Sequence, residues 1–143
     1  MDYRHFLEEV RRRGGFTSDE ETLAVISNVL MAIAELLPQG QVDGVAANLP
    51  PELWVYLRPT HREPDPHFDS QLFLGWVVSS FDITGMRDKA VGGLDYYADY
   101  SGDEAIRRCQ AVFSVMKSVM DEKEQQSLAE LLPGDVQAWF LQA

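Results

Sequence analysis

The chain has 143 residues, of which 45% are hydrophobic and 24% are charged, a composition typical of one globular domain and not of a disordered chain. Aspartate and glutamate outnumber lysine and arginine by 23 to 12, and the formal net charge is −11. Such an excess of negative charge repels phosphate backbones, so we expect no nucleic-acid binding.

The first helix is predicted over residues 2–13. Acidic residues lie early in it, arginines occupy its last turn, and Gly14-Gly15 ends it. We interpret the arginines at 11–13 as favourable charges at the negative end of the helix dipole, rather than as a nucleic-acid patch. The apolar side chains that recur at helical spacing are Tyr3, Phe6, Leu7 and Val10.

A long helix is predicted over residues 18–37. Ser18 and Glu21 form the Ser-x-x-Glu pattern of a capping box, in which the serine oxygen accepts from a backbone N–H three residues on and the glutamate reaches back to the serine N–H. Proline and glycine at 38–40 end this helix, and two short helices are predicted over 41–48 and 51–57.

Residues 58–68 contain three prolines and predict an extended connection. Imidazole and carboxylate groups gather in this segment, and both are good ligands for zinc or another divalent ion. Because the prolines hold the backbone extended, these side chains also fit a solvated linker. The candidate ligands are His61, Glu63, Asp65 and His67.

The remaining predicted helices follow the proline-containing connection. Helices are predicted over residues 69–81, 101–120, 121–132 and 134–141, and residues 82–100 form a glycine- and tyrosine-rich insertion, helix or loop. No segment alternates with period two for long enough to indicate a sheet. The sequence therefore predicts an all-α fold, a single domain of about eight helices.

Residues 18–57 and 101–140 align without a gap, and the capping pattern recurs at Ser101 and Glu104. We interpret the match as an internal repeat, with a first unit at 1–57, the connection at 58–68 and a second unit at 69–143. Two such units are expected to share one core, since one alone cannot bury its apolar stripe. The paired stripes are Ile26, Val29, Leu30, Ile33, Leu36 and Leu37 against Cys109, Val112, Phe113, Met116, Val119 and Met120.

The residues Phe6, Leu7, Val10, Leu49, Pro50 and Glu52 recur as Phe73, Leu74, Val77, Leu132, Pro133 and Asp135. This pattern of Phe-Leu-x-x-Val, a capped helix and Leu-Pro-x-[Glu/Asp] resembles the bacterial domain-of-unknown-function 2267 family. The resemblance covers nearly the whole chain and implies a duplicated helical unit. It implies no activity, substrate, cofactor or catalytic residue, and the insertion at 82–100 departs from the first copy.

The single cysteine, Cys109, excludes an intrachain disulfide and is expected to be a small buried hydrophobe rather than a nucleophile. No apolar run approaches the ~18 residues needed to span a bilayer, and no signal peptide is evident. We therefore expect a cytoplasmic protein of bacterial type with no membrane insertion.

The function class that we favour is a non-enzymatic binding or interaction protein, with a protein partner or self-association and no cofactor. The insertion supplies the contact candidates, because tyrosine combines apolar area with a hydrogen-bonding tip. These candidates are Tyr96, Tyr97 and Tyr100.

Two alternatives stay open at the level of sequence. One is a small hydrolase- or isomerase-like enzyme, which requires acids of the insertion to converge with Arg87 in a pocket. The other is a divalent-metal-binding protein that uses the histidines and acids of 61–67. The acids of the first alternative are Asp88, Asp95 and Asp99.

Overall fold

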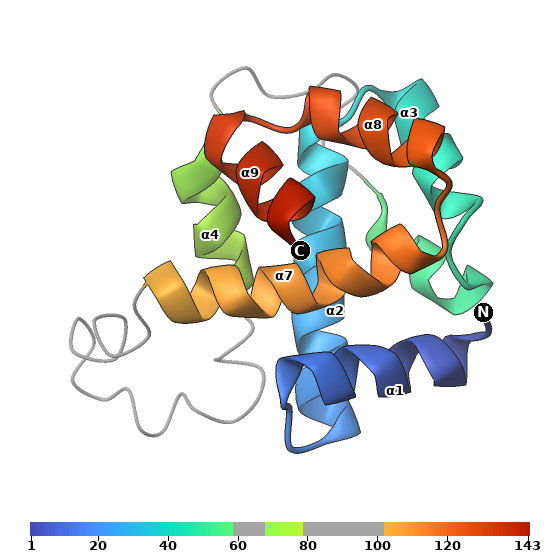
Figure 1. Ribbon diagram of the computed structural model, residues 1–143. Helices are drawn as coiled ribbons and strands as arrows, with labels where there is room; N and C mark the ends of the chain where they lie inside the picture. The colour runs from blue at the N-terminus through green and yellow to red at the C-terminus, as the bar shows by residue number, and fades with distance from the viewer. Residues whose placement is uncertain (59–67, 79–101) are drawn as a thin grey trace.

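The computed structural model describes residues 1–58, 68–78 and 102–143 of the chain (Figure 1). Within these ranges every regular element is a helix, which confirms the predicted all-α class. Eight helices are described: α1 (Tyr3–Gly14), α2 (Asp19–Leu36), α3 (Gln39–Ala46), the 3-10 helix η1 (Pro51–Tyr56), α4 (Ser70–Val78), α7 (Gly102–Ser118), α8 (Glu122–Leu131) and α9 (Gly134–Gln142).

The turn after α1 needs both of its glycines. Gly15 has φ 64°, a left-handed conformation that side chains rarely adopt, and its N–H reaches the carbonyl groups of Arg11 and Arg12. A Cβ atom on Gly14 would lie 2.3 Å from the ring of Phe16. The predicted glycine stop is therefore confirmed, and it lets Phe16 fold back into the core.

The predicted cap of α2 is confirmed in one of its two bonds. The Ser18 hydroxyl accepts from the Glu21 N–H at 3.0 Å. The Glu21 carboxylate, however, accepts from the N–H and hydroxyl of Thr17, at 3.2 and 2.8 Å, where the capping box predicted a bond to the serine N–H. Ser101, the predicted second cap, lies outside the described residues.

The apolar stripes of α2 and α7 face the core as predicted. Ile26, Ile33, Val112 and Met116 are fully buried. One hydrophobic cluster contains side chains from each of the eight described helices. At the edge of the stripes, Leu36 and Val119 are only half-buried.

Helix packing follows one scheme in both halves. The first helix of each half packs on both long helices: α1 on α2 and α7, and α4 on α7 and α2. The last helix of each half packs on its own long helix, η1 on α2 and α9 on α7. In Figure 1, α2 and α7 cross near the middle of the molecule. We propose that the halves are two copies of one unit, and this matched pairing supports the proposal.

Replacing Ile33 or Met116 by alanine empties a fully buried site. We expect each change to lower the free energy of unfolding by about 2–5 kcal/mol, because the transfer free energy of the side chain is lost and a cavity remains. Urea denaturation followed by circular dichroism measures the loss. The control is Leu72→Ala on α4, where the side chain is exposed. A loss at Ile33 as small as that at Leu72 would contradict the packing of the stripes.

Candidate functional site

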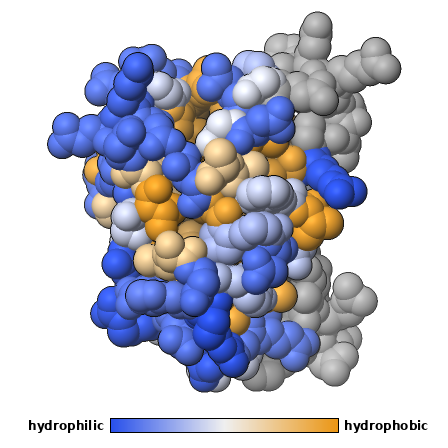
Figure 2. Space-filling view, turned by 90° about the vertical axis from the view of Figure 1, so that its right-hand side faces the viewer, coloured by the Kyte–Doolittle hydropathy of each residue, from blue (hydrophilic) through white to orange (hydrophobic). Residues whose placement is uncertain are grey.

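A groove with a volume of about 340 Å³ separates α3 from α8. The two helices do not pack closely on each other, and the groove opens between them. On the face shown in Figure 2, orange apolar surface is exposed between blue hydrophilic areas. The groove is lined by Gln41, Gly44, Val45, Asn48, Met120, Lys123, Glu124, Ser127, Leu128 and Leu131.

Each helix presents one face to this groove, through residues spaced three and four apart. The same spacing holds on both sides, and in the alignment of the two halves Val45 is equivalent to Leu128. Both of these side chains are buried and belong to the core cluster, together with Met120. The floor of the groove is therefore apolar, and amide, hydroxyl and charged groups form its rim.

One hydrogen bond joins the two sides of the groove, from the amide nitrogen of Asn48 to the Glu124 carboxylate. The same amide donates to the Gly44 carbonyl at 3.1 Å. The other carboxylate oxygen of Glu124 accepts from the Asp121 N–H at 3.2 Å and so completes a capping box at the start of α8. Glu124 thus anchors α8 and links it to the end of α3, with both of its oxygens in use.

Lys123 and Ser127 also line the groove. Neither side chain has a hydrogen bond or an ion pair to any other residue in the described ranges. A Cβ atom on Gly44, across from them, would meet no atom within 4 Å. The groove therefore has open space over the middle of α3 and hydrogen-bonding groups that are available to a ligand.

A second hollow, of about 370 Å³, lies between α8 and α9. Two of its lining amides donate to backbone carbonyls: Gln125 to those of Lys117 and Met120, and Gln137 to that of Ala129. Its charged groups are the acids Glu122 and Glu130, both on α8. Since two of its amides are in use and its charged groups are of one sign, we take the groove between α3 and α8 as the candidate site.

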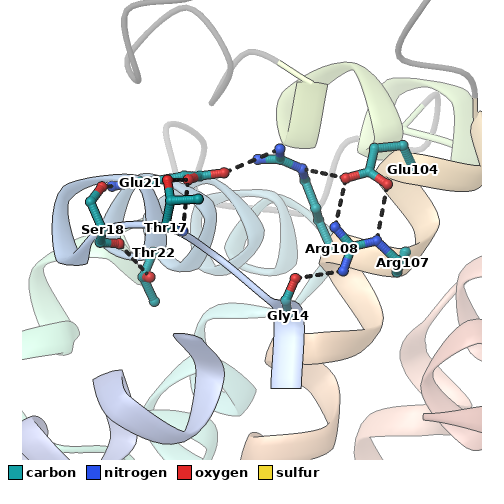
Figure 3. Close-up of polar contacts among 8 residues, drawn as sticks. All are labelled: Gly14, Thr17, Ser18, Glu21, Thr22, Glu104, Arg107 and Arg108. Atoms are coloured by element: carbon teal, nitrogen blue, oxygen red, sulfur yellow. Dashed lines mark hydrogen bonds and ion pairs between the residues drawn. The ribbon is translucent and has the colours of Figure 1, made fainter. Parts of the chain in front are cut away.

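A cluster of charges around the buried Arg108 lies away from the groove, where α1 and the start of α2 meet α7 (Figure 3). The Arg108 side chain is 7% exposed and forms ion pairs with Glu21 at 3.2 Å and with Glu104 at 3.1 Å. Its guanidinium lies 5.3 Å from the centre of the Phe16 ring, within the range of a cation–π interaction. Arg108 therefore joins α2 to α7.

Arg107 extends this cluster to α1. It binds both oxygens of Glu104, at 2.7 and 2.9 Å, and donates to the Gly14 carbonyl at 2.5 Å. Hydrogen bonds from Arg107 and Arg108 hold the pKa of the Glu104 carboxyl below its ordinary value of 4.5. The acids here are saturated by arginine, so we assign the cluster to stability rather than to catalysis.

The sequence-predicted site residues lie outside the described residues. These are the metal candidates His61, Glu63, Asp65 and His67, the acids Asp88, Asp95 and Asp99, and the contact candidates Tyr96, Tyr97 and Tyr100.

Among the residues that the structure describes, no three His, Cys, Asp or Glu side chains gather as a metal site would require. Burial raises the pKa of the Cys109 thiol well above its ordinary value, in agreement with the expectation of a buried hydrophobe.

Sequence reasoning did not find the groove, because it depends on how α3 and α8 face each other. Two local signals point toward it. One is a glycine, Gly44, in a short helix where alanine would be more stable. The other is the Asp121-x-x-Glu124 capping pattern at the start of α8.

The arginines at 11–13 are also accounted for by their partners. Arg11 pairs with Asp19 at 2.9 Å, and Arg12 and Arg13 both pair with Glu9, at 2.6 and 3.2 Å. These contacts agree with their interpretation as structural charges at the end of α1.

The described residues thus form an all-helical fold with a groove between two short helices, α3 and α8. A family model described as "Uncharacterized conserved protein (DUF2267)" matches residues 3–139, and the chain belongs to this family. No curated protein matches the sequence. None of the helices in the described ranges is long and apolar enough to cross a membrane.

The ion pairs of Glu104 predict acid sensitivity. Because its pKa is lowered by folding, its contribution to stability is fully present above the ordinary value of 4.5 and is lost as the pH falls through the lowered pKa. We expect Glu104→Gln to be destabilising at neutral pH and to approach wild-type stability as the pH falls below the lowered pKa of Glu104. Urea denaturation across this range measures the effect, with the exposed Glu130→Gln as control. A pH-independent difference would contradict this role of Glu104.

We predict no measurable binding of duplex DNA or RNA at physiological salt. The excess of acids opposes phosphate contacts, and the arginines at 11–13 are held by carboxylates. A gel-shift titration tests this. A salt-dependent shift that disappears when all three arginines are replaced by alanine would overturn the prediction.

Proposed function

We propose that the protein is a non-enzymatic binding protein and that it takes a small amphipathic ligand in the groove between α3 and α8. The observation that carries this proposal is the combination of an apolar floor with polar rim groups from both helices. A volume of about 340 Å³ lies within the range of small-molecule sites. The apolar part of a ligand would cover Val45 and Leu128, and its polar end would exchange hydrogen bonds with the rim.

Gly44 supports the proposal. Glycine in a helix interior is about 1 kcal/mol less favourable than alanine. The backbone here has no positive φ, and a Cβ atom would meet nothing within 4 Å, so neither strain nor packing requires glycine. Its effect at this position is to leave the groove wide at the middle of α3.

The other functional proposals from the sequence concern residues outside the described ones. They are contact with a protein partner or a second copy through Tyr96, Tyr97 and Tyr100, catalysis by acids of the 82–100 insertion, and metal binding within 61–67. No described contact favours one of them over another. A cytoplasmic location remains part of our proposal, in keeping with a single cysteine that is buried.

Filling the groove tests the proposed function. The probe is N-phenylnaphthylamine, a neutral dye whose fluorescence rises in apolar surroundings. We expect saturable binding to the wild-type protein and at least tenfold weaker binding to Gly44→Leu, because the leucine side chain occupies the groove. Fluorescence titration gives the affinities, and thermal melting verifies that the variant folds.

The matched control is Gly75→Leu. Gly75 also lies inside a helix, α4, and a Cβ atom there also meets no atom within 4 Å, but it does not line the groove. Both variants are expected to be slightly more stable than wild type, by up to about 1 kcal/mol, since leucine favours a helix over glycine. Equal dye binding by the two variants, or none by the wild type, would contradict the proposal.

A further inference from the structure

We infer that the ligand of the groove carries one negatively charged carboxylate on an apolar chain, as a medium-chain fatty acid does, and that Lys123 binds the carboxylate. This inference rests on the proposed function and names the chemical class of its ligand.

The first observation is the pairing of the positive charges. Among the lysines and arginines that the structure describes, all but Arg58 and Lys123 form an ion pair or a hydrogen bond. The arginines at 4, 11, 12, 13, 107 and 108 pair with carboxylates, and Lys117 donates to the carbonyls of Phe140, Leu141 and Ala143.

The Lys123 side chain is exposed and its ammonium is open to a ligand from solution. Lys123 follows Glu122 and precedes Glu124 in the sequence, and it pairs with neither. Its side chain lines the groove, whereas Arg58, the other such cation, does not. The groove therefore presents a positive charge that the described part of the fold does not use.

The second observation concerns the hydrogen bonds that the Glu124 carboxylate, the acid of the groove, already accepts. Both oxygens of Glu124 already accept hydrogen bonds, one from the Asp121 N–H and one from the Asn48 amide. A cationic ligand would have to compete with these bonds, which also hold the start of α8. The charged group left for a ligand is the Lys123 ammonium, which can only donate, and the Ser127 hydroxyl and the Gln41 amide can donate beside it.

These groups match a carboxylate. The ammonium supplies a charge-assisted hydrogen bond, and a hydroxyl or amide can satisfy the second oxygen. One lysine offsets one negative charge, so a singly charged head fits better than a phosphate in a protein of net charge −11. An unbranched hydrocarbon chain would then extend over Val45, Leu128 and Leu131, the apolar part of the groove.

Three probes with the same chain and different heads test the inference: octanoate, octanol and octylammonium. Each is titrated into the full chain, and binding is followed by heteronuclear NMR. We expect octanoate to bind at least tenfold more tightly than the other two. Lys123→Gln should weaken octanoate at least tenfold and leave octanol unchanged, because only the charged head loses its partner.

Arg58→Gln is the matched control, since among the described residues Arg58 is the other cation without a partner, and it lies outside the groove. This variant should leave octanoate binding unchanged. Tighter binding of octylammonium, or octanoate binding that is unaffected by Lys123→Gln, would overturn the inference and leave the groove as a binding site. Failure of all three probes while N-phenylnaphthylamine still binds would also overturn it. Failure of all three and of the dye would overturn the proposed function as well.

Discussion

The fold depends on the burial of two apolar stripes, one on α2 and one on α7, where these helices cross. Ile26, Ile33, Val112 and Met116 are fully buried there. Neither long helix can bury such a stripe against the short helices of its own half alone, so each half needs the other. The first helix of each half also packs on the long helix of the other half, α1 on α7 and α4 on α2. This exchange makes one domain of the two halves.

The crossing also explains the positions of the two polar features. At the start of α2, Glu21 comes within reach of Arg108 on α7, and Arg108 in turn holds Glu104 one turn earlier on its own helix. Two carboxylates around one arginine satisfy a charge that would otherwise be costly to bury. Away from this cluster, α3 and α8 approach each other without close packing, and the space between them becomes the groove.

Local rules predicted what depends on nearby residues. The stripes, the Ser18 cap and the glycine stop after α1 all follow from spacing or from a single residue type, and each is present. The prediction of the second capping-box bond of α2 was wrong, because the N–H and the hydroxyl of Thr17 donate to the Glu21 carboxylate instead. Arg108, which also draws on that carboxylate, is far away in the sequence, and no local pattern predicts such a contact.

The groove also depends on contacts between distant residues, which no local pattern predicts. The proposed duplication accounts for part of its lining. Its equivalent floor residues, Val45 and Leu128, are both apolar because they belong to the core. Its rim differs between the halves: Gly44 stands opposite Ser127 in the alignment, and Asn48 opposite Leu131. A polar rim over an apolar floor suits the amphipathic ligand that we propose, since its polar end would meet the rim and its apolar end the floor.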